Sequence, residues 1–238
     1  MAELGRWTQA VRTGMGADPA VGAVVPPIYL STNYLFDGMG QPGAYDYSRS
    51  NNPTRDLLSD ALATLEGGVG ATTVGTGLAA ITLIAEAFIP AGGRAVVQHD
   101  AYGGTWRLFA FLAEQGRFDV DFVDFNDVEA FQAALGRKPA VVWVETPSNP
   151  LLRITDIAAA SAAAHEAGAL VVADNTFLSP LLQRPLEQGA DLVVHSTTKF
   201  LNGHSDVVGG AVIASTQEQH ERLRLWGNAL GLTAGAFD

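Results

Sequence analysis

Short runs of apolar residues alternate with amphipathic segments along most of this 238-residue chain. The apolar runs have the length of buried strands, and they are Ala71–Val74, Ala95–Val97, Val120–Val123, Ala140–Val144, Ala169–Ala173, Leu192–Val194 and Ala211–Ile213. Helical periodicity lies between most of them, at Leu78–Phe88, Thr105–Glu114, Val128–Leu135 and Ile157–Glu166. A further helix, capped by Thr54 and ended by Gly67, is expected before the first strand. This βαβ series predicts an α/β fold with a mostly parallel seven-stranded sheet between helices.

The first part of the chain lacks this periodicity. It contains paired prolines, several glycines and aromatic residues such as Tyr34, Phe36 and Tyr45. Disordered tails are poor in aromatic residues, so we expect an ordered N-terminal arm over residues 1–53 that packs on another surface. Residues 54–238 then form one large domain.

Polar residues follow several predicted strands. Gly77 comes soon after the first strand, Tyr102 after the second, Asn149 after the fourth, Asp174 after the fifth and Lys199 after the sixth. Ligands of parallel sheets bind outside the carboxyl ends of the strands. We therefore expect these residues to share one site.

The segment Gly75–Ala80 fits the pattern G-x-G-x-x-G/A between a strand and a helix. It is typical of dinucleotide-binding proteins, in which an acidic residue such as Asp100 follows about twenty residues later. A tight turn that packs the helix on the sheet is the alternative, and both stay open here. In either case glycine lets backbone N–H groups approach an anion at the start of a helix.

Lysine is scarce, because only Lys138 and Lys199 occur in the chain. Lys138 lies in a surface turn before a strand, whereas Lys199 follows a strand and precedes a glycine-containing loop. Partial desolvation there would make its amine nucleophilic, and the hydroxyls of Ser196 and Thr198 could donate to a phosphate. An exposed loop lysine is the alternative.

Asp174 ends a very apolar strand, where a carboxylate is costly without a partner. A protonated pyridine nitrogen, as in pyridoxal 5′-phosphate (PLP), would be such a partner, although Asp174 could also cap the turn that follows. Tyr102 could stack on an aromatic cofactor or be a half-buried core residue. Tyr47 and Arg49 could bind a phosphate or belong to a surface ion pair.

Composition excludes several classes of function. The net charge of −11 argues against a nucleic-acid partner, and the absence of cysteine excludes disulfides and thiolate metal sites. The histidines lack metal-ligand spacing, so no metal is expected. The N-terminus has no signal-peptide core, and no apolar run reaches membrane-spanning length. We expect a cytoplasmic protein with no membrane contact.

Taken together, the segments resemble the trans-sulfuration branch of fold-type I PLP-dependent enzymes, the Cys/Met metabolism family, and look most like its bacterial cystathionine γ-synthases. The matching stretches run in family order along nearly the whole chain, which is far more specific than any single motif. They are VVPPIYLSTNY, YDYSRSNNPTRD, LATLEGG, GTGLAAI, HDAYGGTWRLF, VETPSNPLLRITDI, ADNTFLSP, HSTTKFLNGHSDVVGG and TAGAFD.

The resemblance implies PLP as cofactor and assigns roles around it. A homo-oligomer is also implied, a dimer of dimers whose active sites are shared between subunits. The implied roles are the Schiff-base lysine for Lys199, the pyridine-nitrogen partner for Asp174, a hydrogen bond to the phenolic oxygen for Asn149, ring stacking and proton transfer for Tyr102, phosphate binding for Gly77, Leu78, Ser196 and Thr198, and phosphate binding in the neighbouring subunit for Tyr47 and Arg49.

The implied reaction is γ-replacement, in which O-succinyl-L-homoserine and L-cysteine give cystathionine for methionine biosynthesis. Cystathionine γ-lyase and O-succinylhomoserine sulfhydrylase activities remain alternatives. Family members continue beyond residue 238 into a C-terminal domain that supplies an arginine for the substrate carboxylate, and we expect that domain to be absent here. A PLP-binding but catalytically impaired fragment is therefore a further alternative, and an NAD-binding oxidoreductase rests only on Gly75–Ala80.

Overall fold

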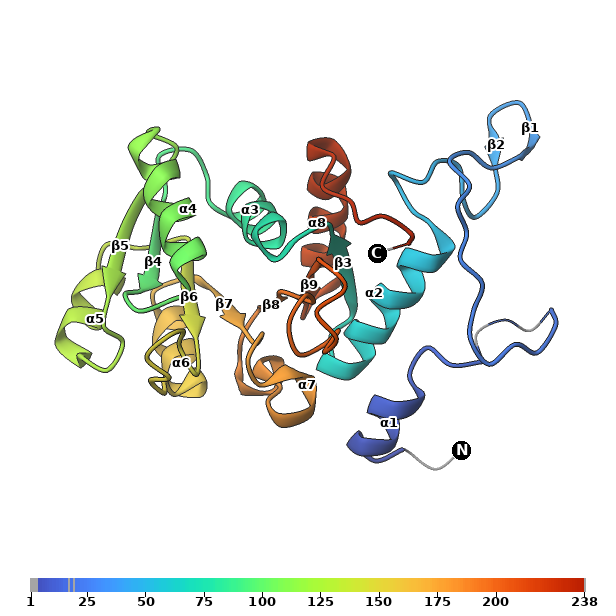
Figure 1. Cartoon of the computed structure of the whole chain (residues 1–238). Helices are drawn as coiled ribbons and strands as arrows, with labels where there is room; N and C mark the ends of the chain where they lie inside the picture. The colour runs from blue at the N-terminus through green and yellow to red at the C-terminus, as the bar shows by residue number, and fades with distance from the viewer. Residues whose placement is uncertain (1–3, 17, 19, 238) are drawn as a thin grey trace.

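A computed structural model describes residues 4–16, 18 and 20–237 of the chain (Figure 1). Residues 1–3, 17 and 19 of the expected arm, and residue 238 of the expected large domain, lie outside the described residues. None of the helices that the structure describes is long and apolar enough to cross a membrane.

A seven-stranded sheet in the order β3-β9-β8-β7-β6-β4-β5 forms the centre of the fold. Every pairing between β8 and β5 in this order is parallel, whereas β9 runs antiparallel to both of its neighbours, β3 and β8. The predicted α/β fold with a mostly parallel seven-stranded sheet is thus confirmed. The strands are β3 (Gly70–Val74), β4 (Arg94–Gln98), β5 (Asp119–Val123), β6 (Val141–Glu145), β7 (Leu170–Asp174), β8 (Leu192–His195) and β9 (Gly210–Ala214).

Helices cover both faces of the sheet, as Figure 1 shows. One face packs under α3, α4 and α8 around Trp143 and Phe109, and the other packs under α2, α5 and α6. Consecutive residues of one strand, such as Val96 and Val97, belong to opposite faces, as the two-residue period of a strand requires. The helices are α2 (Pro53–Glu66), α3 (Gly77–Phe88), α4 (Gly103–Glu114), α5 (Val128–Leu135), α6 (Ile157–Glu166), α7 (Ser179–Leu182), the 3-10 turn Pro185–Gln188 and α8 (Gln217–Leu230).

The structure corrects the predicted start of α2. Asn52, not Thr54, is the cap, because its side-chain oxygen accepts the N–H groups of Thr54 (3.0 Å) and Arg55 (3.4 Å) while Pro53 takes the first helical position. The Thr54 hydroxyl instead accepts the N–H of Tyr29 at 2.8 Å. The end at Gly67 is as predicted, with φ of 78°.

Several strands extend one residue further than predicted. Glu145, Asp174 and His195 are the last residues of β6, β7 and β8 rather than the first residues after them. Their backbones are therefore held by the sheet, which fixes the direction of their side chains at its carboxyl edge.

The arm contains a short helix, α1 (Arg6–Arg12), and a small hairpin of β1 (Phe36–Gly38) and β2 (Gln41–Pro42). Helix α1 contacts α2 and α7, and the rest of the arm extends beyond α2 on the right of Figure 1. Large apolar side chains of the arm, among them Leu35 and Met39, are fully exposed. This chain therefore leaves these apolar side chains of the arm uncovered.

Candidate functional site

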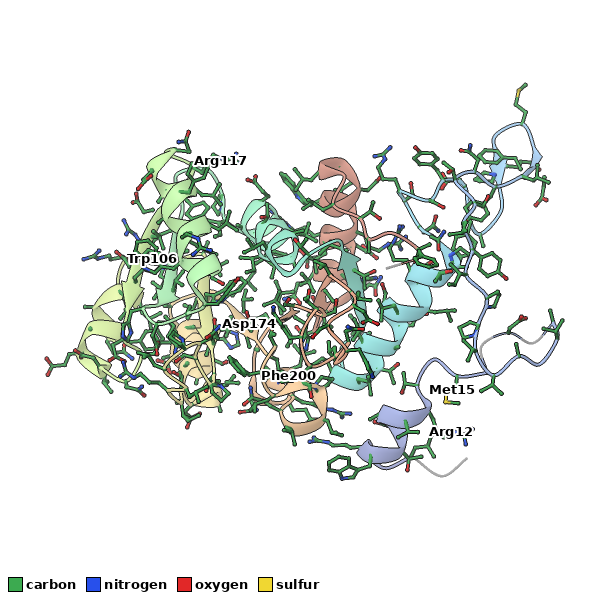
Figure 2. All side chains as sticks on the ribbon, in the orientation of Figure 1. Arg12, Met15, Trp106, Arg117, Asp174 and Phe200 are labelled. Carbon is green, nitrogen blue, oxygen red and sulfur yellow. The ribbon has the colours of Figure 1, made fainter. Side chains whose placement is uncertain are left out.

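A cavity of about 950 Å³ opens at the carboxyl edge of the sheet, between the starts of α3 and α4 and the loop after β8. Figure 2 shows Asp174 and Phe200, which both line it, near the middle of the molecule. The structure brings together most of the residues predicted from the sequence, namely Gly77, Leu78, Tyr102, Asn149, Asp174, Ser196, Thr198 and Lys199.

One end of the cavity is formed by the start of α3. Thr76 caps this helix, since its hydroxyl accepts the N–H of Ala79 at 2.9 Å. The N–H groups of Gly77 and Leu78 have no acceptor within the helix, because the first turn lacks one. A Cβ on Gly77 would lie only 2.7 Å from the Cβ of Ser196. Glycine therefore lets backbone donors and the Ser196 hydroxyl approach the same point, an arrangement that suits an anion such as phosphate.

The loop after β8 provides the hydroxyls and the amine. Among the described residues no hydrogen-bond partner is found for the Ser196 hydroxyl, which leaves it able to donate to a ligand. The Thr198 hydroxyl already accepts the N–H of Gly209 at 3.0 Å and contacts its carbonyl at 3.3 Å. Lys199 lies in this loop and lines the cavity, but it is exposed to solvent. The single chain therefore does not supply the partial desolvation expected for its amine.

Asp174 lies at the floor of the cavity. Its Oδ1 accepts the N–H of Thr176 at 3.0 Å. This oxygen therefore caps the following turn, as the alternative interpretation predicts. The side chain is partly open to the cavity but deep in the protein, and desolvation raises the pKa of Asp174 although Thr176 and His195 act in the opposite direction. A cationic group above it would remove this penalty.

A second carboxylate, Glu145, lies beside Asp174 on the neighbouring strand, where the two residues are register partners. It is buried, lines the same cavity and accepts the N–H groups of Tyr102 (2.7 Å) and Asn149 (2.8 Å). Burial, followed by the charge of Asp174, raises the pKa of Glu145 to about 8. No role for Glu145 is predicted from the sequence, where its place at a strand end is the only signal.

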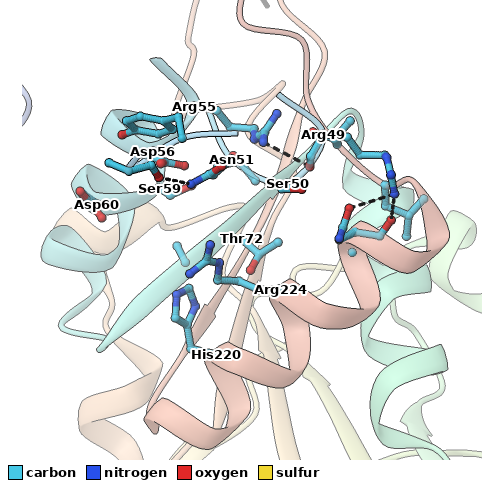
Figure 3. A pocket seen from close by; sticks show the side chains of 18 residues that line it. Arg49, Ser50, Asn51, Arg55, Asp56, Ser59, Asp60, Thr72, His220 and Arg224 are labelled. Carbon is cyan, nitrogen blue, oxygen red and sulfur yellow. Dashed lines mark hydrogen bonds between the residues drawn. The ribbon is translucent and has the colours of Figure 1, made fainter. Parts of the chain in front are cut away.

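Tyr47 and Arg49 do not reach this cavity. Arg49 lines a separate, smaller cavity between the arm, α2 and α8 and donates to Asn228, at 2.9 Å to the carbonyl and 3.0 Å to Oδ1 (Figure 3). Its guanidinium lies 5.6 Å from the centre of the Tyr47 ring. Both residues are exposed. Their assignment to a neighbouring subunit's phosphate stays a prediction.

The residues present fit PLP. The start of α3 and Ser196 match a phosphate, the desolvated carboxyl of Asp174 matches a protonated pyridine nitrogen, and Lys199 supplies a primary amine in the same cavity. The dinucleotide alternative fits poorly, because β3 lies beside the antiparallel β9 and not beside β4, to which α3 leads. A dinucleotide-binding unit needs two adjacent parallel strands at that point.

Among the described residues no cluster suitable for a metal ion is found.

Comparisons with known proteins agree with this geometry. The family model "Cys/Met metabolism PLP-dependent enzyme" matches residues 7–238. The chain is 54% identical to the cystathionine γ-synthase of Escherichia coli and 42% identical to a cystathionine β-lyase of Coxiella burnetii, with 97% of the chain covered in both cases. It also resembles the crystal structure of a Xanthomonas oryzae cystathionine γ-synthase, with a TM-score of 0.97, 55% identity and 100% of the chain covered. The chain spans 60–61% of the length of these relatives.

Proposed function

The chain belongs to the Cys/Met metabolism PLP-dependent enzymes, and from that premise we propose that its cavity holds PLP covalently on Lys199. The observation that carries the proposal is that three features line one cavity: an amine, a half-buried carboxylate and a glycine-lined helix start. Each alone has an ordinary structural explanation. A single ligand that carries an aldehyde, a basic ring nitrogen and a phosphate accounts for all three.

Each feature has its own part in binding. The N–H groups of Gly77 and Leu78, with Ser196 and Thr198, hold the phosphate. Asp174 holds the ring nitrogen in its protonated form, since desolvation of the carboxylate is then offset by an opposite charge. Tyr102 covers the ring.

Asn149 also lines the cavity. Its backbone is fixed by Glu145, and its side-chain amide would donate to the phenolic oxygen of the cofactor.

The chemistry follows from these positions. When bound, PLP withdraws electrons from the substrate carbon that bears the amine. The Lys199 amine, once the substrate amine has displaced it, removes the proton from Cα and carries protons between Cα and Cβ. Tyr102, which lines the same cavity, assists this transfer.

We further propose γ-replacement as the reaction of the whole protein. The ester bond at Cγ of O-succinyl-L-homoserine breaks, succinate leaves, and the sulfur of L-cysteine forms the new bond at Cγ to give cystathionine. The identity to the Escherichia coli γ-synthase supports this choice, as does the Xanthomonas oryzae structure, which is a complex with aminoacrylate and cysteine. The cystathionine β-lyase relative supports cleavage of cystathionine as the second candidate.

The arm is proposed to act on a second copy of the chain. Its large apolar side chains are exposed, and Arg49 and Tyr47 lie outside the cavity of their own chain. A homo-oligomer in which these residues reach the neighbour's phosphate would account for both observations. A dimer of dimers is the assembly proposed.

The reaction is tested by product analysis on the PLP-loaded protein. O-succinyl-L-homoserine with L-cysteine should give cystathionine and succinate, and cystathionine alone should be left unchanged. Pyruvate and homocysteine from cystathionine alone would favour the β-lyase candidate. PLP binding with no product from either substrate would contradict both reactions for this chain and favour a PLP-binding fragment.

A further inference from the structure

Glu145 connects the loops after β4 and β6 through their backbones, beside the side-chain bond from the Ser148 hydroxyl to Asp100 at 2.6 Å. Its Oε2 accepts the N–H of Tyr102, which follows β4, and its Oε1 accepts the N–H of Asn149, which follows β6. Its own N–H donates to the Gln98 side chain at 3.1 Å. Glu145 is 3% exposed, and each of its two carboxylate oxygens accepts one of the bonds from Tyr102 and Asn149.

Both bonds act on residues that line the cavity. Tyr102 is the N-cap of α4 but makes no side-chain capping bond, so Glu145 fixes its backbone from outside the helix. The Tyr102 ring lies directly over Gly104, where a Cβ would come within 2.3 Å of it. The ring therefore packs against Gly104, while the Tyr102 backbone is anchored by Glu145. Asn149 is anchored by the same carboxylate from the opposite loop.

We propose that Glu145 is a positioning residue of the cofactor site, whose carboxylate holds the Tyr102 and Asn149 loops together and so sets the slot for the ring. This inference rests on the proposed PLP site. Glu145 touches neither phosphate nor ring in this role, and it acts through the two residues that it anchors.

The ionisation of Glu145 links its two hydrogen bonds to ligand binding. Asp174 faces it from β7 and Asp100 from the end of β4, while His195 lies near Asp174 and Lys199 lines the same cavity. With two carboxylates side by side, one proton is retained near neutral pH, and desolvation and Asp174 raise the pKa of Glu145 to about 8. A cationic ring nitrogen on Asp174 favours the ionised form of Glu145, which is the form that accepts both N–H groups best.

The test compares Glu145→Gln with Glu66→Gln. Glu66 is also a fully buried acid, but its Oε1 contacts His195 and Asn175 instead of the two loops. PLP dissociation constants are measured by titration of the apoproteins, with the visible absorbance band of bound PLP as readout. We expect about a tenfold weaker Kd for Glu145→Gln, since one charge-assisted bond is lost, and a smaller change for Glu66→Gln.

A pH series distinguishes positioning from a general loss of structure. Above about pH 8 Glu145 is already ionised in the apoprotein, whereas below it PLP binding must displace a proton. The ratio of the Kd of Glu145→Gln to that of the wild type should be largest above pH 8 and decline below it. Proton equilibria that the two proteins share cancel in this ratio.

The outcomes are separable from those of the proposed function. No PLP band in the wild type contradicts the cofactor proposal itself. A normal band in the wild type with equal Kd values for Glu145→Gln and the wild type, or a Kd ratio that is independent of pH, overturns the role of Glu145 alone. Equal weakening in Glu145→Gln and Glu66→Gln also overturns it, since any buried acid would then have the same effect.

Discussion

Gly77 and Ser196 approach so closely that a methyl group on Gly77 would lie 2.7 Å from the Ser196 Cβ and 2.9 Å from its Oγ. The two residues come from α3 and from the end of β8, which are far apart in sequence. Their contact brings the first N–H groups of the helix and a hydroxyl to one point, and this is the proposed phosphate site. The space for the phosphate thus depends on the absence of a single side chain.

Gly77→Ala should therefore weaken PLP binding by about tenfold or more, since Ser196 or the helix start has to shift and charge-assisted bonds are lost. Gly75→Ala is the matched control, because a Cβ there meets only the carbonyl of Thr233 at an ordinary 3.5 Å. Titration with PLP measures both variants. Equal binding by Gly77→Ala and the wild type would place the phosphate elsewhere.

The stability of the apoprotein should depend on pH through Glu145. Its pKa is raised to about 8 from an ordinary 4.5, so the folded state binds more protons than the unfolded state between these values. The free energy of unfolding should fall as pH rises from about 4.5 to about 8 and then level off. Glu145→Gln should remove much of this slope. Denaturant unfolding of both apoproteins across the range checks this, and parallel curves would be evidence against the raised pKa.

A buried pair behind the site should matter for stability. His195 Nε2 lies 2.5 Å from Glu66 Oε1, and both residues are fully buried. Replacement of Glu66 by Ala removes this partner of the His195 ring, and replacement of His195 by Ala leaves Glu66 with Asn175 as its remaining partner, so each should cost about 3–5 kcal/mol. His165→Ala should cost less than about 1 kcal/mol, because its contact with Asp191 at 2.9 Å is near the surface. Unfolding curves measure both, and similar losses would contradict the distinction.

Much of the fold follows from the sequence because buried strands and amphipathic helices have local signals. All seven strands of the large sheet were predicted, and the bounds of α5 and α6 match the prediction. The antiparallel direction of β9 has no local signal, since it depends on which neighbours the strand meets. Helix α8 was not predicted. It is largely polar, with only Leu223 and Gly227 buried, so its apolar side is too narrow to stand out.

Some residues of the site can likewise be predicted from the sequence, and others cannot. Residues at strand ends were identified because the carboxyl edge of a parallel sheet collects them. Glu145 shares that position but makes backbone bonds to loops distant in sequence, which no spacing reveals. Arg49 is the opposite case. Its motif was recognised, yet its proposed ligand belongs to another copy of the chain, so one chain alone places it beside Asn228.

The shared site can be tested by complementation. Arg49→Ala keeps Lys199 but loses the proposed phosphate contact, and Lys199→Ala keeps Arg49 but loses the amine. Each variant alone should bind PLP weakly or without the visible band. After mixing and reassembly, a hybrid contains one site with both residues, so part of the band should return. No recovery from hybrids of demonstrated composition would mean that Arg49 does not serve a neighbouring subunit.

The central claim, that PLP is held on Lys199, has a direct test because the chain contains only Lys138, Lys199 and the N-terminus as primary amines. Borohydride reduction of the PLP-loaded protein makes the covalent link permanent, and peptide mass mapping then locates it. The account predicts one phosphopyridoxyl group on Lys199, its loss in Lys199→Ala and its retention in Lys138→Ala. Attachment to Lys138 or the N-terminus, or an unmodified Lys199, would contradict it.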